Sequence, residues 1–419
     1  MRGIYYGWWI LAGAGLGMAL IGGLYMWAFG LYIEPLEDQF GWSRAEVSLG
    51  ISVALLASGI ASPLVGRLTD FWGPRLTLLL GTVFATAGLG LLSTTTALWQ
   101  WYVYSAVLGV SLAMAFFIPF PVLLSRWFDR RRALALGLLG VAPASLGGLA
   151  MVPIVRALID ALGWDGAFLA SGTIIFAVFL PVSLFLVRDA PPRDVTGAHP
   201  DAPTGEHGAL QSEPVGIRLG AAIRMPLFWI LTLGVSFYFY ASFGLIVHAV
   251  PFFENEGLSS ATAAGIVAAM AGVSFFSRVA VAGVAYRVHR FERIAIALAF
   301  AGILAVSVLF AGTATPFILV FILFWAILDT APPILESMIL PPAFGVAYFA
   351  TILGTVGIIR TVFMLISPTV AGVIFDETDS YTGVFIMFIA AFVGAMVLFY
   401  LSLRFPRPVE ITTSAPTPR

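Results

Sequence analysis

Long apolar runs separated by short polar stretches make up most of this chain. Twelve such runs can be traced, each about 20–29 residues long, which is enough for an α-helix to cross the hydrocarbon core of a bilayer. The pattern therefore predicts an all-α integral membrane protein with twelve transmembrane helices. We expect these helices at residues 5–33, 46–66, 75–95, 98–126, 133–160, 166–187, 226–252, 261–285, 293–313, 316–339, 346–374 and 381–404.

One longer polar stretch divides the apolar runs into two sets of six. Residues 188–225 are rich in proline, glycine and charged residues, so we interpret them as a cytoplasmic linker. The linker separates an N-terminal six-helix bundle, residues 1–187, from a C-terminal six-helix bundle, residues 226–405. The last residues, 406–419, are rich in proline, serine and threonine, and we expect them to form a disordered cytoplasmic tail.

The two halves repeat one another at a constant spacing. Gly66 and Gly283 are separated by the same 217 positions as Gly137 and Gly354. A constant offset of this kind indicates duplication, which is the parallel-repeat layout of many transporters. The two bundles are therefore predicted to be pseudo-symmetric.

Composition supports a membrane protein and argues against enzymes. Only 10% of the residues are charged and 60% are hydrophobic, whereas about a quarter of the residues in soluble domains are charged. The chain has no cysteine, which excludes disulfides and thiolate chemistry, and its four histidines are scattered without ligand spacing. No nucleophile with a nearby base is visible, so we expect no enzymatic activity, no cofactor and no metal.

The basic residues indicate the orientation in the membrane. The chain has no lysine, so all 21 basic residues are arginine. With both termini in the cytoplasm, Arg44 is the only arginine in an outer loop, while the outer loops are rich in aspartate and glutamate. This predicts a multi-pass protein of the cell (inner) membrane that contacts the lipid bilayer. We expect a monomer that binds no nucleic acid.

Two arginines lie deep inside apolar runs. Arg278 is the only charge in residues 261–285, and Arg360 is the only charge in residues 346–375. A cation at membrane depth costs about 2.5–3.5 kcal/mol on insertion scales, so such a residue faces the bundle interior and has an anionic partner. These arginines are the first candidates for contact with a substrate.

The most specific motif runs from Gly66 to Arg75. Its residues resemble the G-x-x-x-D-x-x-G-x-[RK] loop of the major facilitator superfamily, between the second and third of twelve helices. Gly66 and Gly73 allow a tight turn and a close approach of helices. Asp70 can accept hydrogen bonds from helix N-termini or pair with an arginine, which would hold the cytoplasmic side in one state. We assign a gating role to these three residues and to Arg75.

A second motif, from Arg126 to Gly137, indicates which branch of the superfamily the chain resembles. It is similar to the W/Y-F-x-[KR]-R-x-L-A-x-G signature of monocarboxylate transporters and their bacterial relatives, which include oxalate/formate-type exchangers. The segments Tyr6-Gly7-Trp8-Trp9 and Phe40-Gly41-Trp42-Ser43-Arg44-Ala45-Glu46 resemble the same family. We assign a conformational role to Arg130 and Arg131, which can also anchor the chain to anionic lipid.

The resemblance gives Arg278 a role. In that family an arginine of helix 8 is implicated in holding the substrate carboxylate, and a guanidinium has the planar donor geometry for that task. A structural ion pair is the alternative. Animal members carry an aspartate, linked to proton coupling, four residues earlier, where this chain has Ser274. Their lysine in helix 1 is also absent. Ser274 is retained as a substrate-side candidate.

Helix 10 supplies the acids that could replace that aspartate. Asp329 lies near its middle, and Glu336 follows seven residues later on the same face. Pro332-Pro333 should bend or break the helix between them. Asp329 could neutralise Arg278 or Arg360 in the empty site and release that arginine on protonation, or it could form a permanent structural ion pair. Of the two arginines, we expect Asp329 to pair with Arg360. We expect Glu336 to bind a loop arginine near the cytoplasm.

Other candidates are weaker. His248, near the outer end of helix 7, could contact substrate or protons, or could be an interfacial histidine. Tyr25 and Phe117 could form the apolar wall of a small-acid pocket, or be ordinary packing. Together the residues and the resemblance predict proton-coupled transport of a small monocarboxylate, such as lactate or pyruvate, by alternating access. The alternative is a dicarboxylate/monocarboxylate exchanger that uses both Arg278 and Arg360.

Overall fold

The computed structural model describes residues 5–128, 131–142, 147, 150–190, 216–285, 288, 290–329 and 335–406. All regular elements in these residues are helices, as the apolar runs predicted. The residues form two compact units. The first contains residues up to Val215 together with Val346–Ile358, and the second contains Gly216–Gly345 and the residues from Ile359 onward.

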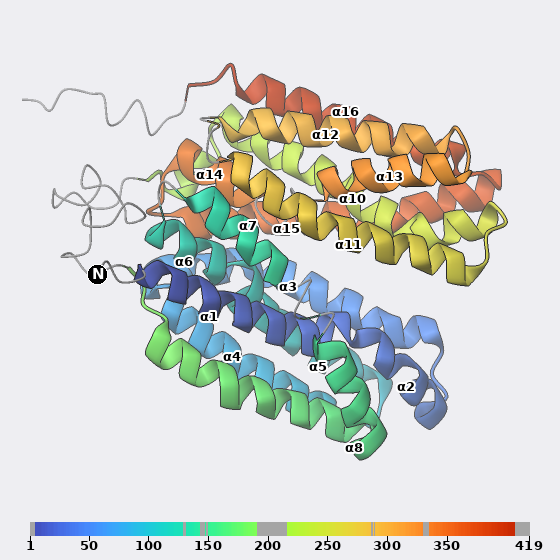
Figure 1. The fold of residues 1–419 in the computed structure, drawn as a ribbon. Helices are drawn as coiled ribbons and strands as arrows, with labels where there is room; N and C mark the ends of the chain where they lie inside the picture. Colours follow the sequence, from blue (N-terminus) through green and yellow to red (C-terminus); the bar gives the residue numbers. More distant parts are fainter. Residues whose placement is uncertain are drawn as a thin grey trace, which may run out of the picture. The chain divides into compact units, whose positions relative to one another are not determined.

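The first unit is built from helices of the N-terminal half (Figure 1). Helices α3 and α4 both pack along α5, and α8 packs against α4. The helices of this unit are α1 (Tyr6–Ile21), α2 (Ile33–Phe40), α3 (Arg44–Trp72), α4 (Pro74–Leu92), α5 (Leu98–Leu112), α6 (Pro119–Trp127), α7 (Arg132–Ala142) and α8 (Val152–Ile174).

The second unit is built around α16. Both α10 and α12 pack along it, while α13 lies against α11 and α12. The helices are α9 (Leu219–Ala222), α10 (Pro226–Asn255), α11 (Ser260–Ala285), α12 (Phe291–Leu309), α13 (Thr315–Leu328), α14 (Leu335–Phe344), α15 (Phe349–Thr378) and α16 (Tyr381–Ser402). The residues of α15 up to Ile358 belong to the first unit, and the rest belong to the second.

Several helix ends differ from the predicted ones. The first predicted helix ends at residue 33, but helical structure continues through α2 to Phe40, because the first residue that breaks it is Gly41 with φ +67°. The predicted loop from Gly66 to Arg75 is also mostly helical. Only Gly73, with φ +90°, separates α3 from α4. In the same way Gly163, with φ +76°, interrupts α8 where we predicted a loop.

Wide, π-helical turns occur at several points in the first unit. One covers Gly22–Trp27 and carries Tyr25, and another covers Ala113–Phe117. A π-turn holds one more residue than an α-turn, and such turns are common at functional sites. Two of the predicted site residues, Tyr25 and Phe117, thus lie in wide turns.

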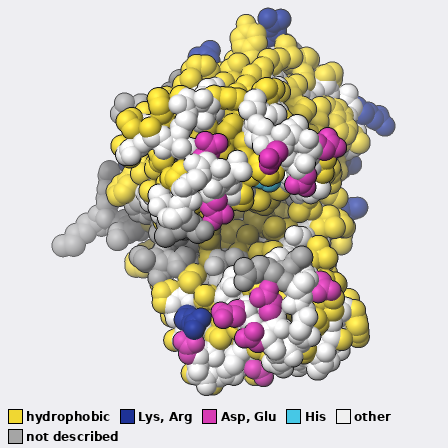
Figure 2. Space-filling model, turned by 90° about the vertical axis from the view of Figure 1, so that its right-hand side faces the viewer, with side chains coloured by type: hydrophobic (Ala, Val, Ile, Leu, Met, Phe, Trp, Pro, Cys, Tyr) yellow, Lys and Arg dark blue, Asp and Glu magenta, His cyan; other side chains and the backbone are white. Residues whose placement is uncertain are grey.

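Length and composition agree with a membrane protein of many spans. Nine helices of the described residues are long and apolar enough to cross a bilayer, and Gly265–Arg278 and Thr315–Leu328 are shorter apolar helices. Figure 2 shows one face of the molecule, on which several acidic side chains gather. Most acids that the sequence assigned to outer loops are exposed in the structure: Glu34, Asp38, Glu254, Glu256, Asp376, Glu377 and Asp379.

Candidate functional site

The motif that begins at Gly66 forms a helix junction in the first unit. The backbone N–H of Arg75 donates to Oδ1 of Asp189 at 2.8 Å, and the Arg75 guanidinium donates to the carbonyl of Leu184. A Cβ atom on Gly73 would lie 2.7 Å from the same Asp189 oxygen. Glycine is therefore required at position 73 both by its positive φ and by the carboxylate that holds the start of α4.

Asp70 binds the N-terminus of α15. Its Oδ1 accepts from the backbone N–H of Ala350 at 3.0 Å, and its Oδ2 accepts from the N–H of Thr351 at 2.7 Å and from the Thr351 hydroxyl at 2.6 Å. The first N–H groups of a helix have no partner within the helix, so a carboxylate satisfies them and complements the helix dipole. The sequence predicted that Asp70 binds either a helix N-terminus or an arginine. The hydrogen bonds observed are those to a helix N-terminus.

Two glycines bring α3 and α15 close together. A Cβ atom on Gly66 would lie 2.1 Å from the carbonyl oxygen of Ala350, and one on Gly354 would lie 2.1 Å from the carbonyl oxygen of Ser62. No side chain can be fitted at either position without moving backbone. The close approach lets the Asp70 carboxylate reach the first amides of α15.

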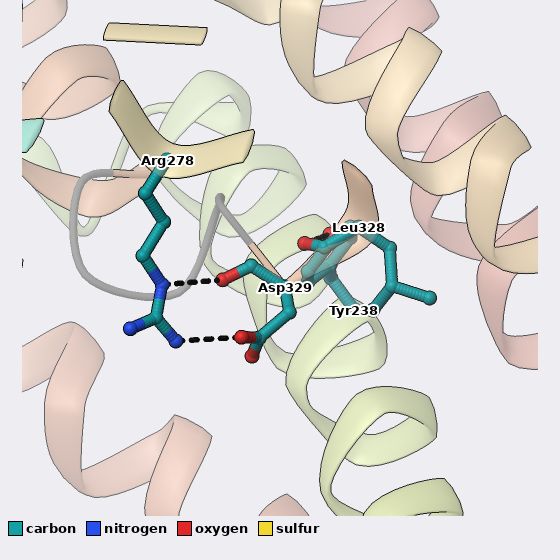
Figure 3. Close-up of polar contacts among 4 residues, drawn as sticks. All are labelled: Tyr238, Arg278, Leu328 and Asp329. Atoms are coloured by element: carbon teal, nitrogen blue, oxygen red, sulfur yellow. Dashed lines mark hydrogen bonds and ion pairs between the residues drawn. The ribbon is translucent and has the colours of Figure 1, made fainter. Parts of the chain in front are cut away.

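The second unit contains the pair of Arg278 and Asp329 (Figure 3). Nη2 of Arg278 lies 2.6 Å from Oδ2 of Asp329, and Nε of the same arginine donates to the Asp329 carbonyl at 3.4 Å. The side chains are 15% and 22% exposed. The sequence named Arg278 as one of two possible partners for Asp329, and the structure selects it.

The end of α13 explains why Arg278 and Tyr238 converge here. Asp329 is the residue that follows the last turn of α13, and Tyr238 donates its hydroxyl to the carbonyl of Leu328. The last carbonyls of a helix have no intrahelical partner, and within a bilayer an unsatisfied carbonyl costs several kcal/mol. Tyr238 and Arg278 donate to two of the carbonyls at this end, those of Leu328 and Asp329.

Arg360 pairs with Glu336, which corrects two predictions. Its Nη1 lies 2.6 Å from Oε2 of Glu336, and the guanidinium lies 4.9 Å from the centre of the Phe239 ring. We had expected Arg360 to pair with Asp329, and Glu336 to bind a loop arginine. Glu336 instead lies buried in the first turn of α14, with a side chain only 8% exposed, so its carboxylate meets the guanidinium on α15.

Several residues of these contacts were missed by sequence reasoning. Tyr238 and Phe239 are consecutive aromatic residues in an apolar helix, where aromatic side chains are usually ordinary packing. Thr351 is one of several threonines in the segment before and within α15. Only the helix start near residue 349 could have singled out Thr351, because helix N-termini attract carboxylates.

His248 has two partners in the second unit. Its Nε2 lies 3.0 Å from the Pro368 carbonyl, and its Nδ1 lies 3.4 Å from the Tyr381 hydroxyl. A carbonyl can only accept, so Nε2 donates to the Pro368 carbonyl. These bonds tie α10 to α15 and α16. They account for His248 without a ligand, and contact with substrate or protons stays a prediction.

The remaining candidates lie outside the ion pairs. Tyr25 is fully buried and Phe117 is half-buried beside Phe116. Ser274 is fully buried one turn before Arg278. Arg131 is exposed in the turn before α7, while Arg130 and the predicted break at Pro332-Pro333 lie outside the described residues.

Within the described part of the chain, no cluster of three or more histidine, aspartate or glutamate side chains could hold a metal ion.

Comparisons with known proteins assign the family. The chain is 27% identical over 263 residues to the oxalate:formate antiporter of Oxalobacter formigenes, covering 60% of this chain and 57% of that protein. It is 26% identical over 370 residues to monocarboxylate transporter 4 of Rattus norvegicus, covering 86% of this chain and 75% of that protein. The chain thus spans little more than half the length of the first relative and three quarters of the second.

A solved structure shares the fold. The crystal structure of the transporter FucP in the outward conformation matches with a TM-score of 0.72 at 14% identity, covering 94% of this chain and 97% of that one. The family model described as Major Facilitator Superfamily matches residues 14–350. These are membrane transporters rather than enzymes, and the fold of twelve helices in two halves agrees with the prediction from the apolar runs. The chain belongs to the Major Facilitator Superfamily.

Proposed function

We propose that this protein carries a small monocarboxylate, similar to lactate or pyruvate, across the cell (inner) membrane by alternating access, with both termini in the cytoplasm and as a monomer. The observation that carries the proposal is the pair of Arg278 and Asp329 in the second unit. The relatives named as monocarboxylate transporters and as an oxalate:formate antiporter support the substrate class.

The chemistry of the proposal is an exchange of carboxylates on one guanidinium. Asp329 occupies Arg278 in the structure. A substrate carboxylate offers the same acceptor geometry, and arginine stays charged at any relevant pH. Protonation of Asp329 weakens its hold on Arg278, and the substrate anion then takes its place.

Proton coupling is part of the proposal because of the membrane potential. Uptake of an anion against a negative-inside potential costs about 2.3 kcal/mol per charge per 100 mV. A proton carried with the anion removes this cost. Asp329 is paired with Arg278, the arginine that we propose to bind the substrate, so Asp329 is our candidate for the proton-carrying group.

An anion exchanger is the second candidate function. It is favoured by Arg360, a second guanidinium in the interior of the second unit, 15% exposed. Exchange of one anion for another also avoids the electrical cost of uncoupled uptake. The proposal of symport and this alternative differ in whether a proton gradient alone drives uptake.

Binding and uptake assays test the proposal together. The purified protein is titrated with lactate, pyruvate, oxalate and formate while thermal stability is followed, since a ligand that binds the folded state raises Tm. Proteoliposomes are then tested for uptake with and without an inward proton gradient. We expect stabilisation by lactate or pyruvate that is lost in Arg278→Ala. Equal binding by parent and variant would reject the proposal, and uptake only from anion-loaded vesicles would favour the exchanger.

A further inference from the structure

Two ion pairs of the second unit are approached by neighbouring residues of α10. Tyr238 binds the last turn of α13, beside Asp329, and Phe239 carries the Arg360 guanidinium on its ring. Consecutive residues of an α-helix differ by only about 1.5 Å along its axis. The described residues of the second unit thus include two guanidinium groups, each held by a carboxylate of the protein itself.

We propose, resting on the proposed function, that Glu336 is a specificity-determining residue: it occupies Arg360 and thereby denies that arginine to the second carboxylate of a dicarboxylate. A substrate with one carboxylate needs only Arg278. A substrate with two would have to displace both Asp329 and Glu336.

Exposure distinguishes the two internal carboxylates. The Asp329 side chain is 22% exposed, whereas that of Glu336 is 8% exposed. Asp329 follows the end of α13, while Glu336 lies within the first turn of α14. More of the Asp329 side chain than of the Glu336 side chain is therefore accessible from outside the protein.

The Arg360 pair keeps unused hydrogen-bonding capacity. Among the described residues, Oε1 of Glu336 and Nε of Arg360 are buried without a hydrogen-bond partner. A guanidinium binds a carboxylate best through two parallel bonds, and Glu336 is bound through only one of its oxygens. Arg360 is thus an incompletely filled carboxylate site, able to accept a better-fitting anion once Glu336 is neutral.

Competition explains why Glu336 protects the site. A carboxylate fixed beside its arginine acts at a high effective concentration and so competes with dissolved substrate for the guanidinium. The apparent affinity of a ligand falls in proportion to the fraction of sites that are free to bind it. Removing the charge of Glu336 removes this competitor and leaves the two pairs with one uncompensated positive charge, which favours a dianion over a monoanion.

The test compares variants and matched ligands. Parent, Glu336→Gln and Glu336→Asp are purified and titrated with the unbranched dicarboxylates from oxalate to adipate, each beside its monomethyl ester. We expect at least one dicarboxylate to bind E336Q ten-fold or more tightly than the parent, with a clearly smaller gain for its monomethyl ester. E336D, whose side chain is one methylene shorter, is expected to show a smaller gain in the same direction and serves as the test should E336Q fail to fold.

Two controls separate the outcomes. In Glu336→Gln combined with Arg360→Ala the gain must disappear, and Glu292→Gln, which removes another buried carboxylate of the second unit, must bind as the parent does. No gain in E336Q or E336D, or a gain that survives loss of Arg360, overturns the inference. If the parent binds lactate and pyruvate but E336Q gains no dicarboxylate affinity, only this inference is contradicted. If the parent binds no monocarboxylate, the proposed function is contradicted.

Discussion

Oδ2 of Asp70 accepts two hydrogen bonds from Thr351, one from the backbone N–H at 2.7 Å and one from the hydroxyl at 2.6 Å. Together with the Ala350 N–H, three donors converge on a single carboxylate at the start of α15. A charged acceptor at a helix N-terminus satisfies amides that the helix leaves unpaired. The acid of the motif is thus a helix cap whose partner lies 281 residues further along the chain.

Replacing Asp70 should lower the thermal stability of the protein. Asp70→Ala removes all three hydrogen bonds and should cost about 1–2 kcal/mol, and Asp70→Asn should cost less because it keeps an acceptor. Tm in detergent measures the effect. Glu34→Gln, which removes an exposed acid from the first turn of α2, is the control and should change little. A Tm for D70A equal to that of the control would contradict the cap.

Adding one methyl group at Gly66 or Gly354 should also destabilise the protein. In Gly66→Ala the new Cβ would meet the Ala350 carbonyl, and in Gly354→Ala it would meet the Ser62 carbonyl. Overpacking against backbone typically costs about 1–3 kcal/mol. In Gly90→Ala, within α4, the Cβ meets nothing within 4 Å, so Tm should stay the same or rise. Equal Tm values for G66A and G90A would show that α3 and α15 do not approach closely.

Breaking the Arg278 pair should cost more than breaking an exposed one. Arg278→Ala leaves Asp329 without its cation, and loss of one partner of a buried pair typically costs about 3–5 kcal/mol. Arg278→Ala with Asp329→Asn should recover much of the stability but not carboxylate binding. Arg156→Ala breaks a pair whose side chains are 59% and 57% exposed, and should cost less than about 1 kcal/mol. Tm and ligand titration of all three variants separate folding from binding.

Asp329→Asn should uncouple uptake from the proton gradient. If Asp329 carries the proton, an amide in its place can neither bind nor release one, while Arg278 still receives an acceptor. Uptake by parent proteoliposomes should rise with an inward proton gradient, and uptake by D329N should not. Counterflow of labelled substrate, which needs no gradient, should persist in D329N. Continued stimulation of D329N by the gradient would assign proton coupling to another residue.

Tyr238→Phe should weaken the end of α13. The change deletes the hydroxyl that donates to the Leu328 carbonyl, and an unsatisfied buried acceptor costs about 1–3 kcal/mol. Tyr240→Phe is the matched control on the same helix, because among the described residues its hydroxyl donates only to the sulfur of Met387, a weak acceptor. A lower Tm for Y238F than for Y240F is the expected result. The reverse order would mean that the Leu328 carbonyl has another donor.

The fold could be predicted from sequence because apolar runs of bilayer length report on helices directly. The twelve predicted helices were read from long apolar stretches, and the motif from Gly66 to Arg75 placed Asp70 where a helix terminus could meet it. The turn at Gly73 was predicted as a wider loop, since the segment contains polar residues such as Arg67 and Asp70. Polar residues do not by themselves end a helix, so the helix continues to Gly73.

The pairing of the charges could not be predicted in the same way. We placed Asp329 and Glu336 on one face by assuming that helical periodicity continues over seven residues. α13 ends at Leu328 and α14 begins at Leu335, so the phase of one helix does not determine the direction of side chains on the next. Which acid pairs with Arg278 and which with Arg360 depends on how helices far apart in the sequence pack together, and the sequence pattern does not give that packing.

The π-helical turn at Gly22–Trp27 has a consequence for how such a protein can change over evolution. A residue inserted into a regular α-helix rotates every later side chain by about 100° around the axis. A π-helical turn instead takes up one extra residue locally, so the residues before and after the turn keep their directions. The same holds for the wide turn that carries Phe117. Insertions and deletions of one residue at these turns can therefore change the turn itself while the packing of the helix on either side is kept.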